Sequence, residues 1–161
     1  MEEDLYLDKL LIQMRKNKNI YLTKIFTFAA AHQYGNAKWS DEKNFEVFGK
    51  DVRVHGHNYT LHVTVTGDVD PDTGFLVDLG HLKAIVKKHI VSVLDHSQFE
   101  KDVPWFKDKQ PSTENLVVFI WDTIAEHLEG CSLHHIRIVE TPTIYTDYYG
   151  CLLYTSPSPR D

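Results

Sequence analysis

Two histidines, His55 and His57, are separated by a single glycine in a stretch rich in Val, Tyr and Thr that runs from 52 to 66. This composition, with its partial alternation of polar and apolar residues, predicts a β-strand. Side chains alternate between the two faces of a strand, so both imidazoles project from one face and Gly56 leaves room between them. His62 has the opposite parity and is excluded. Two imidazoles side by side are half of a divalent-metal site, although the motif alone fits hydrogen-bonded histidines better.

A third histidine, His32, stands at the end of a predicted first strand, Tyr21–Ala31. By itself it is typical of an ordinary histidine at a strand end. The polar segment 33–51 that follows is long for a hairpin connection, and long loops in compact domains are often functional. If the flanking strands pair antiparallel, His32 comes close to His55 and His57. The sequence then predicts a three-histidine site with an open fourth position, which is the pattern of catalytic zinc.

Other polar groups have structural explanations that the residues alone favour. Asp78 precedes a predicted helix and fits its N-cap. Thr113 and Glu114 begin a second predicted helix, where capping and the helix dipole account for both, although the exposed N–H groups there could also hold a phosphate or a polar ring. Asp95 and His96 follow the first helix and fit a surface turn. An adjacent carboxylate and imidazole can also form an acid/base pair.

The predicted elements alternate in a simple order. Two strands come first, then two helices with apolar residues at helical spacing, then two more strands. This order, β-β-α-α-β-β, predicts an α+β domain with two helices inserted in an antiparallel sheet. The strands are expected over 21–31, 52–66, 132–140 and 144–149, the helices over about 79–93 and from 112 or 113 to Gly130, and irregular loops over 33–51 and 100–110.

The two ends of the chain differ from its middle. Residues 1–18 have apolar residues at helical spacing and predict a short amphipathic helix, so we treat 1–20 as an N-terminal extension. Residues 151–161 do not continue the pattern and resemble a translated cloning scar, so we expect a non-native tail there. The predicted domain is 21–150.

Composition excludes several classes of protein. The chain has 161 residues, of which 42% are hydrophobic and 25% charged, as in an ordinary one-domain globular protein. The net charge is -6 without a basic block, so a nucleic-acid partner is not expected. Cys131 and Cys151 have no CxxC spacing, and no apolar run is long enough to cross a membrane. The acidic start, unlike a secretory signal, predicts a cytoplasmic protein. Histidine is unusually frequent, with 10 residues.

Six short motifs in a fixed order resemble the family of 6-pyruvoyl-tetrahydropterin and 6-carboxy-tetrahydropterin synthases. The resemblance covers roughly 21–150, and the order of the motifs makes it specific. They are Phe28-Ala29-Ala30-Ala31-His32, Phe48-Gly49-Lys50 leading into His55-Gly56-His57-Asn58-Tyr59, Asp70-Pro71-x-Thr73-Gly74, Leu94-Asp95-His96, Ser112-Thr113-Glu114-Asn115 and Val139-Glu140-Thr141.

The resemblance implies the tunnelling fold, in which β-β-α-α-β-β subunits join their sheets into a barrel. It implies a homo-oligomer, usually a hexamer of two stacked trimers, with active sites between subunits. It also implies a Zn²⁺ cofactor, held by His32, His55 and His57, and a small-molecule substrate, 7,8-dihydroneopterin triphosphate. Zinc of this kind acidifies protons beside a polarised oxygen.

The resemblance also assigns roles to the other polar groups. Asp95 and His96 match the family's proton relay, which replaces the surface-turn interpretation. Glu140 matches the pterin anchor, because its carboxylate can accept two N–H bonds from an aminopyrimidine edge. Thr113 lies in the motif that borders the pterin.

One position departs from the family. Its catalytic cysteine lies four residues before the first histidine of the His-Gly-His motif, where this chain has Asp51. A carboxylate can abstract a proton if burial raises its pKa. Asp51 therefore leaves open a lyase with a substitute base, a variant that cleaves the side chain to give 6-hydroxymethyl-dihydropterin, or an impaired or repurposed member.

Family membership favours one product and leaves others open. We expect 6-carboxy-5,6,7,8-tetrahydropterin, an early intermediate towards queuosine and related deazapurines, because that is the commonest role of short members of the family. The 6-pyruvoyl product is the alternative lyase outcome. A non-catalytic pterin-binding protein is the alternative of another class, which the complete set of three histidines argues against.

Overall fold

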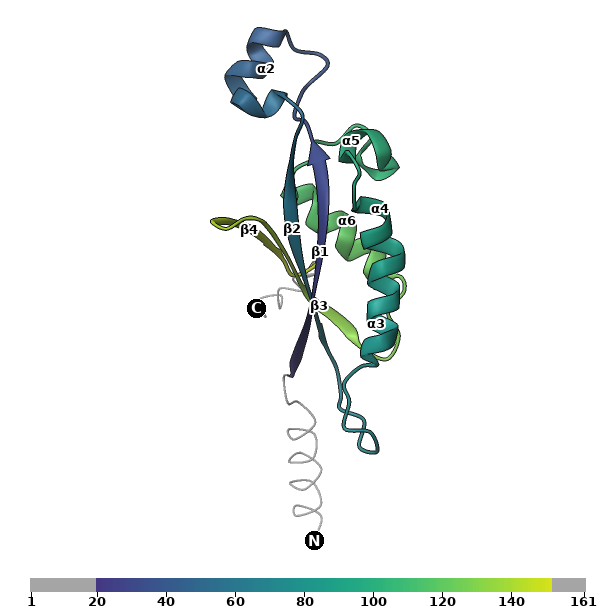
Figure 1. Ribbon diagram of the computed structural model, residues 1–161. Helices are drawn as coiled ribbons and strands as arrows, with labels where there is room; N and C mark the ends of the chain where they lie inside the picture. Colours follow the sequence, from purple (N-terminus) through teal and green to yellow (C-terminus); the bar gives the residue numbers. More distant parts are fainter. Residues whose placement is uncertain (1–19, 152–161) are drawn as a thin grey trace, which may run out of the picture.

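The computed structural model describes residues 20–151, and they form one antiparallel sheet with helices on one face (Figure 1). The N-terminal helix predicted over 1–18, and all of the predicted tail except Cys151, lie outside the described residues. The elements in chain order are β1 (Tyr21–His32), α2 (Asp41–Phe48), the 3-10 helix η1 (Gly49–Val52), β2 (His55–Thr66), α3 (Leu79–Val86), the π-helix η2 (Lys87–Val91), α4 (Ser92–Leu94), α5 (Phe99–Asp102), the 3-10 helix η3 (Pro104–Phe106), α6 (Thr113–Ala125), β3 (Ser132–Thr141) and β4 (Ile144–Tyr148).

The four strands follow one another in the sheet in the order of the chain, β1-β2-β3-β4, and each pair is antiparallel. The predicted α+β order of two strands, two main helices and two strands is therefore confirmed. In the longest pairing, Tyr21 lies opposite Thr66 and His32 lies opposite His55. Strands β1 and β4 form the two edges of the sheet.

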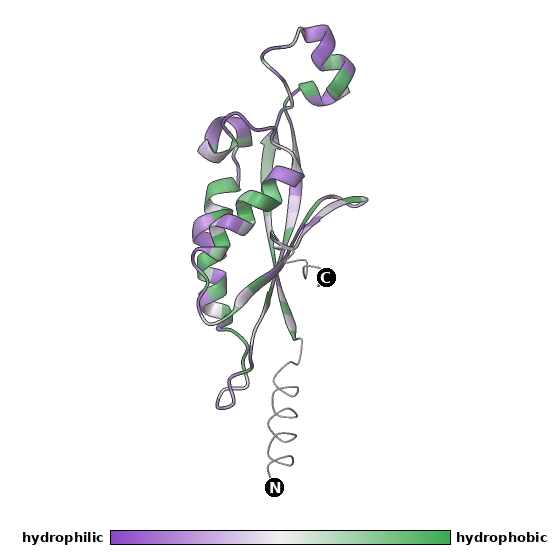
Figure 2. Ribbon diagram, turned by 180° about the vertical axis from the view of Figure 1, so that it is seen from behind, coloured by the Kyte–Doolittle hydropathy of each residue, from purple (hydrophilic) through white to green (hydrophobic). Residues whose placement is uncertain are grey.

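The core lies between the sheet and the helices. Alternate residues of the strands face the helical layer, because the side-chain period of a strand is two. In Figure 2 the helices beside the sheet alternate between hydrophobic and hydrophilic residues, as helices with one buried face do. The central buried side chains are Phe26, Phe28, Tyr59, Leu61, Val63, Leu82, Ile90, Leu116, Ile120, Ile136 and Ile138.

The two long helices begin where the sequence predicts. Asp78 caps α3 by accepting hydrogen bonds from the backbone N–H groups of Gly80 and His81, and Ser112 caps α6 through the N–H of Asn115. The first predicted helix is continuous over 79–94, but its middle part, η2, has π-helical geometry. No helix among residues 20–151 is long and apolar enough to cross a membrane.

The predictions of irregular loops are wrong at two places. The connection 33–51 contains α2 and the start of η1, and the connection 100–110 contains most of α5 and all of η3. The N-cap of helix α2 is Ser40, whose hydroxyl accepts from the N–H of Lys43, and the helix buries no residue. It projects beyond the end of the sheet (Figure 1). The second strand begins at His55, three residues later than predicted, because Val52 is the last residue of η1 and Arg53 is its C-cap.

Candidate metal centre

Three histidines meet at one end of the β1–β2 ladder. His32 is the last residue of β1 and lies opposite His55, the first residue of β2. His57 is two residues further along β2 on the same face. One nitrogen from each of the three side chains lies within 4.8 Å of the others. The predicted convergence of the three imidazoles is therefore what the antiparallel register produces.

Backbone carbonyls fix the orientation of two of these rings. The Nδ1 atom of His32 donates to the carbonyl oxygen of Pro111 at 2.7 Å, and that of His55 donates to the carbonyl oxygen of Arg53 at 2.8 Å. A carbonyl only accepts, so the proton is on Nδ1 and the lone pair of Nε2 is free. Such outer hydrogen bonds are typical of histidines that ligate metals.

The free nitrogen of His32 is the strongest local indication of a missing partner. The residue is 1% exposed, and its Nε2 atom is buried without a hydrogen-bond partner among the described residues. Burial is the largest cause of a lowered pKa of His32, and the nearby His55 and His57 lower it further. The hydrogen bond to the Pro111 carbonyl and the charge of Glu140 raise the pKa, but the net shift is downward. The imidazole is therefore neutral at pH 7, which is the form that binds a metal. The donor set fits a zinc ion.

A carboxylate completes the cluster from the next strand. Glu140 is on β3, and its Oε1 atom lies 3.5 Å from Nε2 of His57 and 3.7 Å from Nε2 of His32. Its side chain is only 14% exposed. It occupies the same face as the buried Ile136 and Ile138 because it continues their two-residue period. The resemblance led us to expect Glu140 to anchor a pterin ring. The structure shows that its carboxylate lies beside His32 and His57.

Gly56 permits the close approach of the two strands at the site. A Cβ atom at this position would lie 2.8 Å from the carbonyl oxygen of Ala30 on the neighbouring strand. Real Cβ atoms do not come so close to a backbone oxygen. The glycine between the two histidines is thus required by the pairing of β1 with β2, as well as leaving room between the rings.

Asp51 lies at the rim of the cluster on η1. Its Oδ1 atom is 3.9 Å from Nε2 of His55, and its side chain is 60% exposed. The backbone carbonyl of Asp51 accepts from the N–H of Tyr34, two residues beyond His32. Tyr34 stacks on Phe48 with ring centroids 5.7 Å apart. These contacts hold the connection that carries Asp51 against the end of the sheet.

Asp95 and His96 form a pair at the outer edge of β1. The Nδ1 atom of His96 lies 2.9 Å from Oδ2 of Asp95, and Oδ1 of Asp95 accepts from the backbone N–H of Ala29. This N–H group is the largest cause that lowers the pKa of Asp95. The side chain of His96 is 83% exposed. It borders a cavity of about 350 Å³ that Gly56 and His57 also line.

The pair makes no direct contact with the three histidines among residues 20–151, although His96 and His57 line the same cavity. Within residues 20–151, neither Asp95 nor His96 has a hydrogen bond or ring contact with the cluster. Ala29 has the opposite strand parity to His32, and Asp95 and His96 attach to the edge of β1 at Ala29. The two side chains do meet, but their adjacency in the sequence could not show where the pair lies, and its role as a proton relay stays a prediction.

Thr113 is buried at the start of α6, and its hydroxyl lies 2.8 Å from that of Thr146 on β4. Ser112, not Thr113, is the N-cap. Sequence reasoning missed Tyr59, whose hydroxyl is buried without a partner among the described residues and whose pKa is raised by burial. Its ring contacts that of His57 at 5.5 Å between centroids. The shared parity of these two residues on β2 was the available signal.

Comparisons with known proteins agree with this geometry. The family profile described as 6-pyruvoyl tetrahydropterin synthase matches residues 21–151. The 6-pyruvoyl tetrahydrobiopterin synthase of Poecilia reticulata is 42% identical over 132 residues, which cover 81% of this chain and 90% of that protein. The 6-carboxy-5,6,7,8-tetrahydropterin synthase of Bacillus subtilis is 35% identical over 109 residues, which cover 64% and 73%. The structure of 6-pyruvoyl tetrahydropterin synthase from Caenorhabditis elegans has a TM-score of 0.77 and 32% identity, and the match covers 82% of this chain and 96% of that one.

Proposed function

The chain belongs to the 6-pyruvoyl tetrahydropterin synthase family, and we propose that it is a zinc-dependent lyase acting on 7,8-dihydroneopterin triphosphate. The observation that carries the proposal is the convergence of three histidine nitrogens within 4.8 Å. A protein that only bound a pterin would need the acidic anchor but no such cluster. Three imidazoles with a further open position are typical of catalytic zinc.

The residues of the cluster would divide the work between holding the metal and moving protons. His32, His55 and His57 would hold the ion. Bound zinc supplies Lewis-acid chemistry that makes protons beside a substrate hydroxyl more acidic. Asp51, whose Oδ1 atom lies 3.9 Å from Nε2 of His55, would take such a proton in place of the family's cysteine.

Glu140 would anchor the pterin ring. Its carboxylate can accept two N–H bonds from the aminopyrimidine edge. It is largely buried beside His57, so the ring would lie next to the metal with its side chain towards the three histidines. Thr113 would border the ring through the start of α6. The short distances from Glu140 to two histidine nitrogens are also compatible with a role as a metal ligand before substrate binds.

The Asp95–His96 pair would serve the active site of another subunit. It is exposed at the edge of β1 and makes no direct contact with the three histidines of its own chain among the described residues. The sheet has two open edges, which natural proteins cover or pair. A homo-oligomer, of the hexameric kind expected for the family, would close these edges and place the relay of one subunit beside the metal of the next.

Two observations bear on the product. Identity is higher with the protein named for the 6-pyruvoyl product, at 42% over 132 residues, than with the protein named for the 6-carboxy product, at 35% over 109 residues. We therefore propose the 6-pyruvoyl product as the first candidate and the 6-carboxy product, which the sequence led us to expect, as the second. The carboxylate at Asp51 keeps the side-chain-cleaving reaction as a further candidate, because it is a weaker base than a thiolate.

The test is an incubation of zinc-loaded protein with 7,8-dihydroneopterin triphosphate, followed by mass spectrometry of the products. A 6-pyruvoyl-tetrahydropterin product confirms the proposed lyase. A 6-carboxy product with acetaldehyde assigns the second reaction, and a 6-hydroxymethyl product assigns the third. Tight pterin binding without turnover at any zinc concentration contradicts the proposal and favours a binding protein.

A further inference from the structure

Two histidines that the proposed reaction does not use lie in contact in the helical layer. His89 is on η2 and His127 follows the end of α6. Their ring centroids are 3.8 Å apart, and the ring planes are inclined by 31°. Both residues are half-buried. The pair is distinct from the cluster of His32, His55 and His57, because β1 and β2 carry that cluster.

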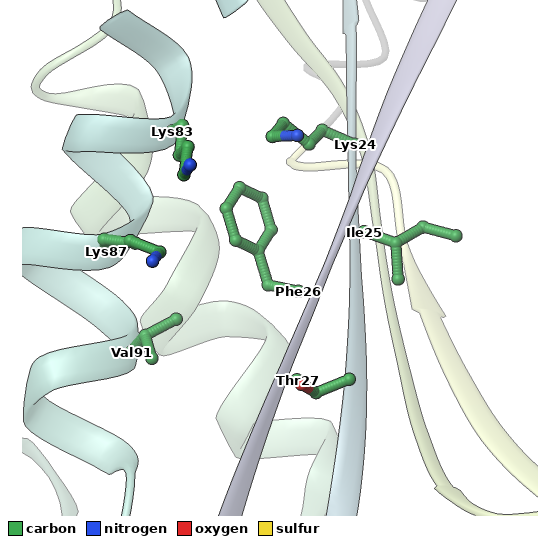
Figure 3. Close-up of a pocket in the computed structure, with 7 residues that line it drawn as sticks. All are labelled: Lys24, Ile25, Phe26, Thr27, Lys83, Lys87 and Val91. Carbon is green, nitrogen blue, oxygen red and sulfur yellow. The ribbon is translucent and has the colours of Figure 1, made fainter. Parts of the chain in front are cut away.

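Helix geometry turns His89 towards α6. Lys83, Lys87 and Val91 lie on one side of the helix, where they face β1 across a cavity of about 330 Å³ (Figure 3). His89 is two residues from both Lys87 and Val91, so it lies on about the opposite side of the helix. On that side η2 packs against α6. The packing of the two helices therefore brings His89 to His127.

The turn that carries His89 is itself unusual. Residues Lys87–Val91 have π-helical geometry, and they interrupt a segment that is α-helical on both sides, over Leu79–Val86 and Ser92–Leu94. Such turns are rare and are found frequently at functional sites. The irregular turn is thus an indication of function at His89 that does not depend on the ring contact.

Both rings have a nitrogen available to a ligand. The Nδ1 atom of His127 donates to the carbonyl oxygen of Thr123 at 2.8 Å, which leaves the lone pair of Nε2 free. His32 and His55 in the candidate metal centre have the same kind of backbone bond. Within residues 20–151, the ring of His89 has a contact with His127 but no hydrogen bond.

The local charges keep His89 in its neutral form. Burial is the largest cause that lowers its pKa, and the charges of His127 and Lys88 lower it further. The group is therefore neutral at pH 7, with a lone pair that can bind a metal.

We propose that His89 and His127 together bind a second divalent transition-metal ion. Imidazole suits Zn²⁺, Cu²⁺ and Ni²⁺, whereas Mg²⁺ and Ca²⁺ prefer oxygen ligands. Water would complete the coordination, because the described residues place no third ligating side chain with this pair. Nitrogen–metal bonds of about 2.0–2.1 Å require the ring centroids to part to about 4.5–5 Å, and rotation of half-exposed side chains permits this. The ion would join η2 to the end of α6.

The test is zinc binding by the full-length protein, measured by equilibrium dialysis and elemental analysis at micromolar free zinc. We expect two ions per chain for the parent and one for His89→Ala and His127→Ala, which retain the three-histidine site. The second ion is held by two imidazoles and not three, so a desalted sample is expected to keep only the first. His81→Ala is the matched control, since His81 is exposed on α3, and it is expected to bind two ions.

Each substitution at the pair is expected to weaken the second ion by about tenfold or more, because changes outside the ligands of a metal already cost about 10- to 100-fold. A second measurement uses thermal unfolding. An ion that binds only the folded protein raises the melting temperature. Zinc beyond one equivalent is therefore expected to raise that of the parent and of His81→Ala, but not that of the two variants. An excess of Mg²⁺ is expected to change neither measurement.

Three outcomes overturn the inference. A parent that binds one zinc shows that the two rings only stack. Single variants that still bind the second ion place it elsewhere, and loss of that ion in His81→Ala shows unspecific surface binding. Where circular dichroism shows that an alanine variant is misfolded, His89→Gln or His127→Gln repeats the measurement with the bulk of the side chain kept. None of these readouts depends on turnover, so the proposed lyase and this site can fail separately.

Discussion

His32 and His55 face each other across the β1–β2 ladder with their ring centroids 4.4 Å apart. Neither residue owes this position to the segment between them, because the register of the two strands fixes both. The metal site is therefore part of the sheet, and its chemistry can be tested by single substitutions that leave the ladder intact.

Replacing His57 by alanine is expected to remove metal and activity together. Two imidazoles do not retain zinc as three do, so the zinc content falls from about one per chain to near zero. Elemental analysis and product formation measure the two effects. His62→Ala is the matched control, because His62 is on the same strand with the opposite parity. An active, zinc-free His57→Ala protein contradicts the three-histidine site.

Asp51→Asn tests the substitute base. Because an amide cannot accept the proton, we expect kcat to fall by about 10²–10⁴ with zinc content unchanged and KM little affected. Asp51→Cys introduces the family's residue and is expected to retain turnover. Steady-state kinetics with product analysis provides the measurement. An unchanged kcat in Asp51→Asn assigns the proton transfer to another group.

Glu140→Gln separates the two possible roles of this carboxylate. As a pterin anchor it makes charge-assisted hydrogen bonds worth about 1.5–3 kcal/mol, so the variant is expected to bind a pterin about 10- to 100-fold more weakly. Fluorescence titration with a pterin and metal analysis of the same sample are the measurements. Loss of zinc from the variant with unchanged pterin affinity shows that Glu140 serves the metal instead.

Gly56→Ala is expected to destabilise the end of the sheet. The added Cβ meets the Ala30 carbonyl at 2.8 Å, and overpacking of this kind costs about 1–3 kcal/mol of unfolding free energy. Zinc affinity is expected to fall as the histidines move apart. Gly35→Ala is the control, since nothing lies within 4 Å of its added Cβ. Equal denaturation midpoints for the two variants contradict this account of the close approach.

Asp147→Asn tests a network on the other face of the sheet. The carboxylate of Asp147 accepts from Arg137 at 2.7 and 2.8 Å and lies 2.7 Å from Nε2 of His135. The hydrogen bonds from Arg137, and then His135, lower the pKa of Asp147 below its usual 3.8. A lowered pKa stabilises the fold above pH 3.8, and this contribution is lost as the pH falls through the folded-state value.

The difference in melting temperature between parent and Asp147→Asn is therefore expected to be constant near neutral pH and to shrink below about pH 4. Thermal unfolding followed across this range measures it. A difference that grows in acid contradicts the assignment of the pKa shift to the ionised carboxylate.

The sequence predicted the site better where ladder geometry decides the outcome. Period-two patterning placed His55 and His57 on one face, and antiparallel pairing then brought His32 to them. Helix α2 was missed because it buries no residue, so its sequence has no hydrophobic periodicity that would indicate a helix. Its signal was the cap Ser40 followed by the acids Asp41 and Glu42.

The position of the Asp95–His96 pair could not be predicted for a different reason. Adjacency in the sequence shows that the two side chains can meet, but not which edge of the sheet they join. That depends on the backbone bonds to Ala29, which form only when the chain after α4 returns to β1. His96 adopts a positive φ of 60° there, which sequence reasoning does not predict for histidine.

The segment between His32 and His55 has a consequence for how such a protein diversifies. The ladder holds the metal ligands, while Asp51 is carried on η1 in the excursion that includes α2. Insertions, deletions or exchanges in the excursion can therefore move or replace the Asp51 carboxylate while the three histidines stay in place. Grafting this segment from relatives with other products onto one unchanged sheet would test how far it determines the product.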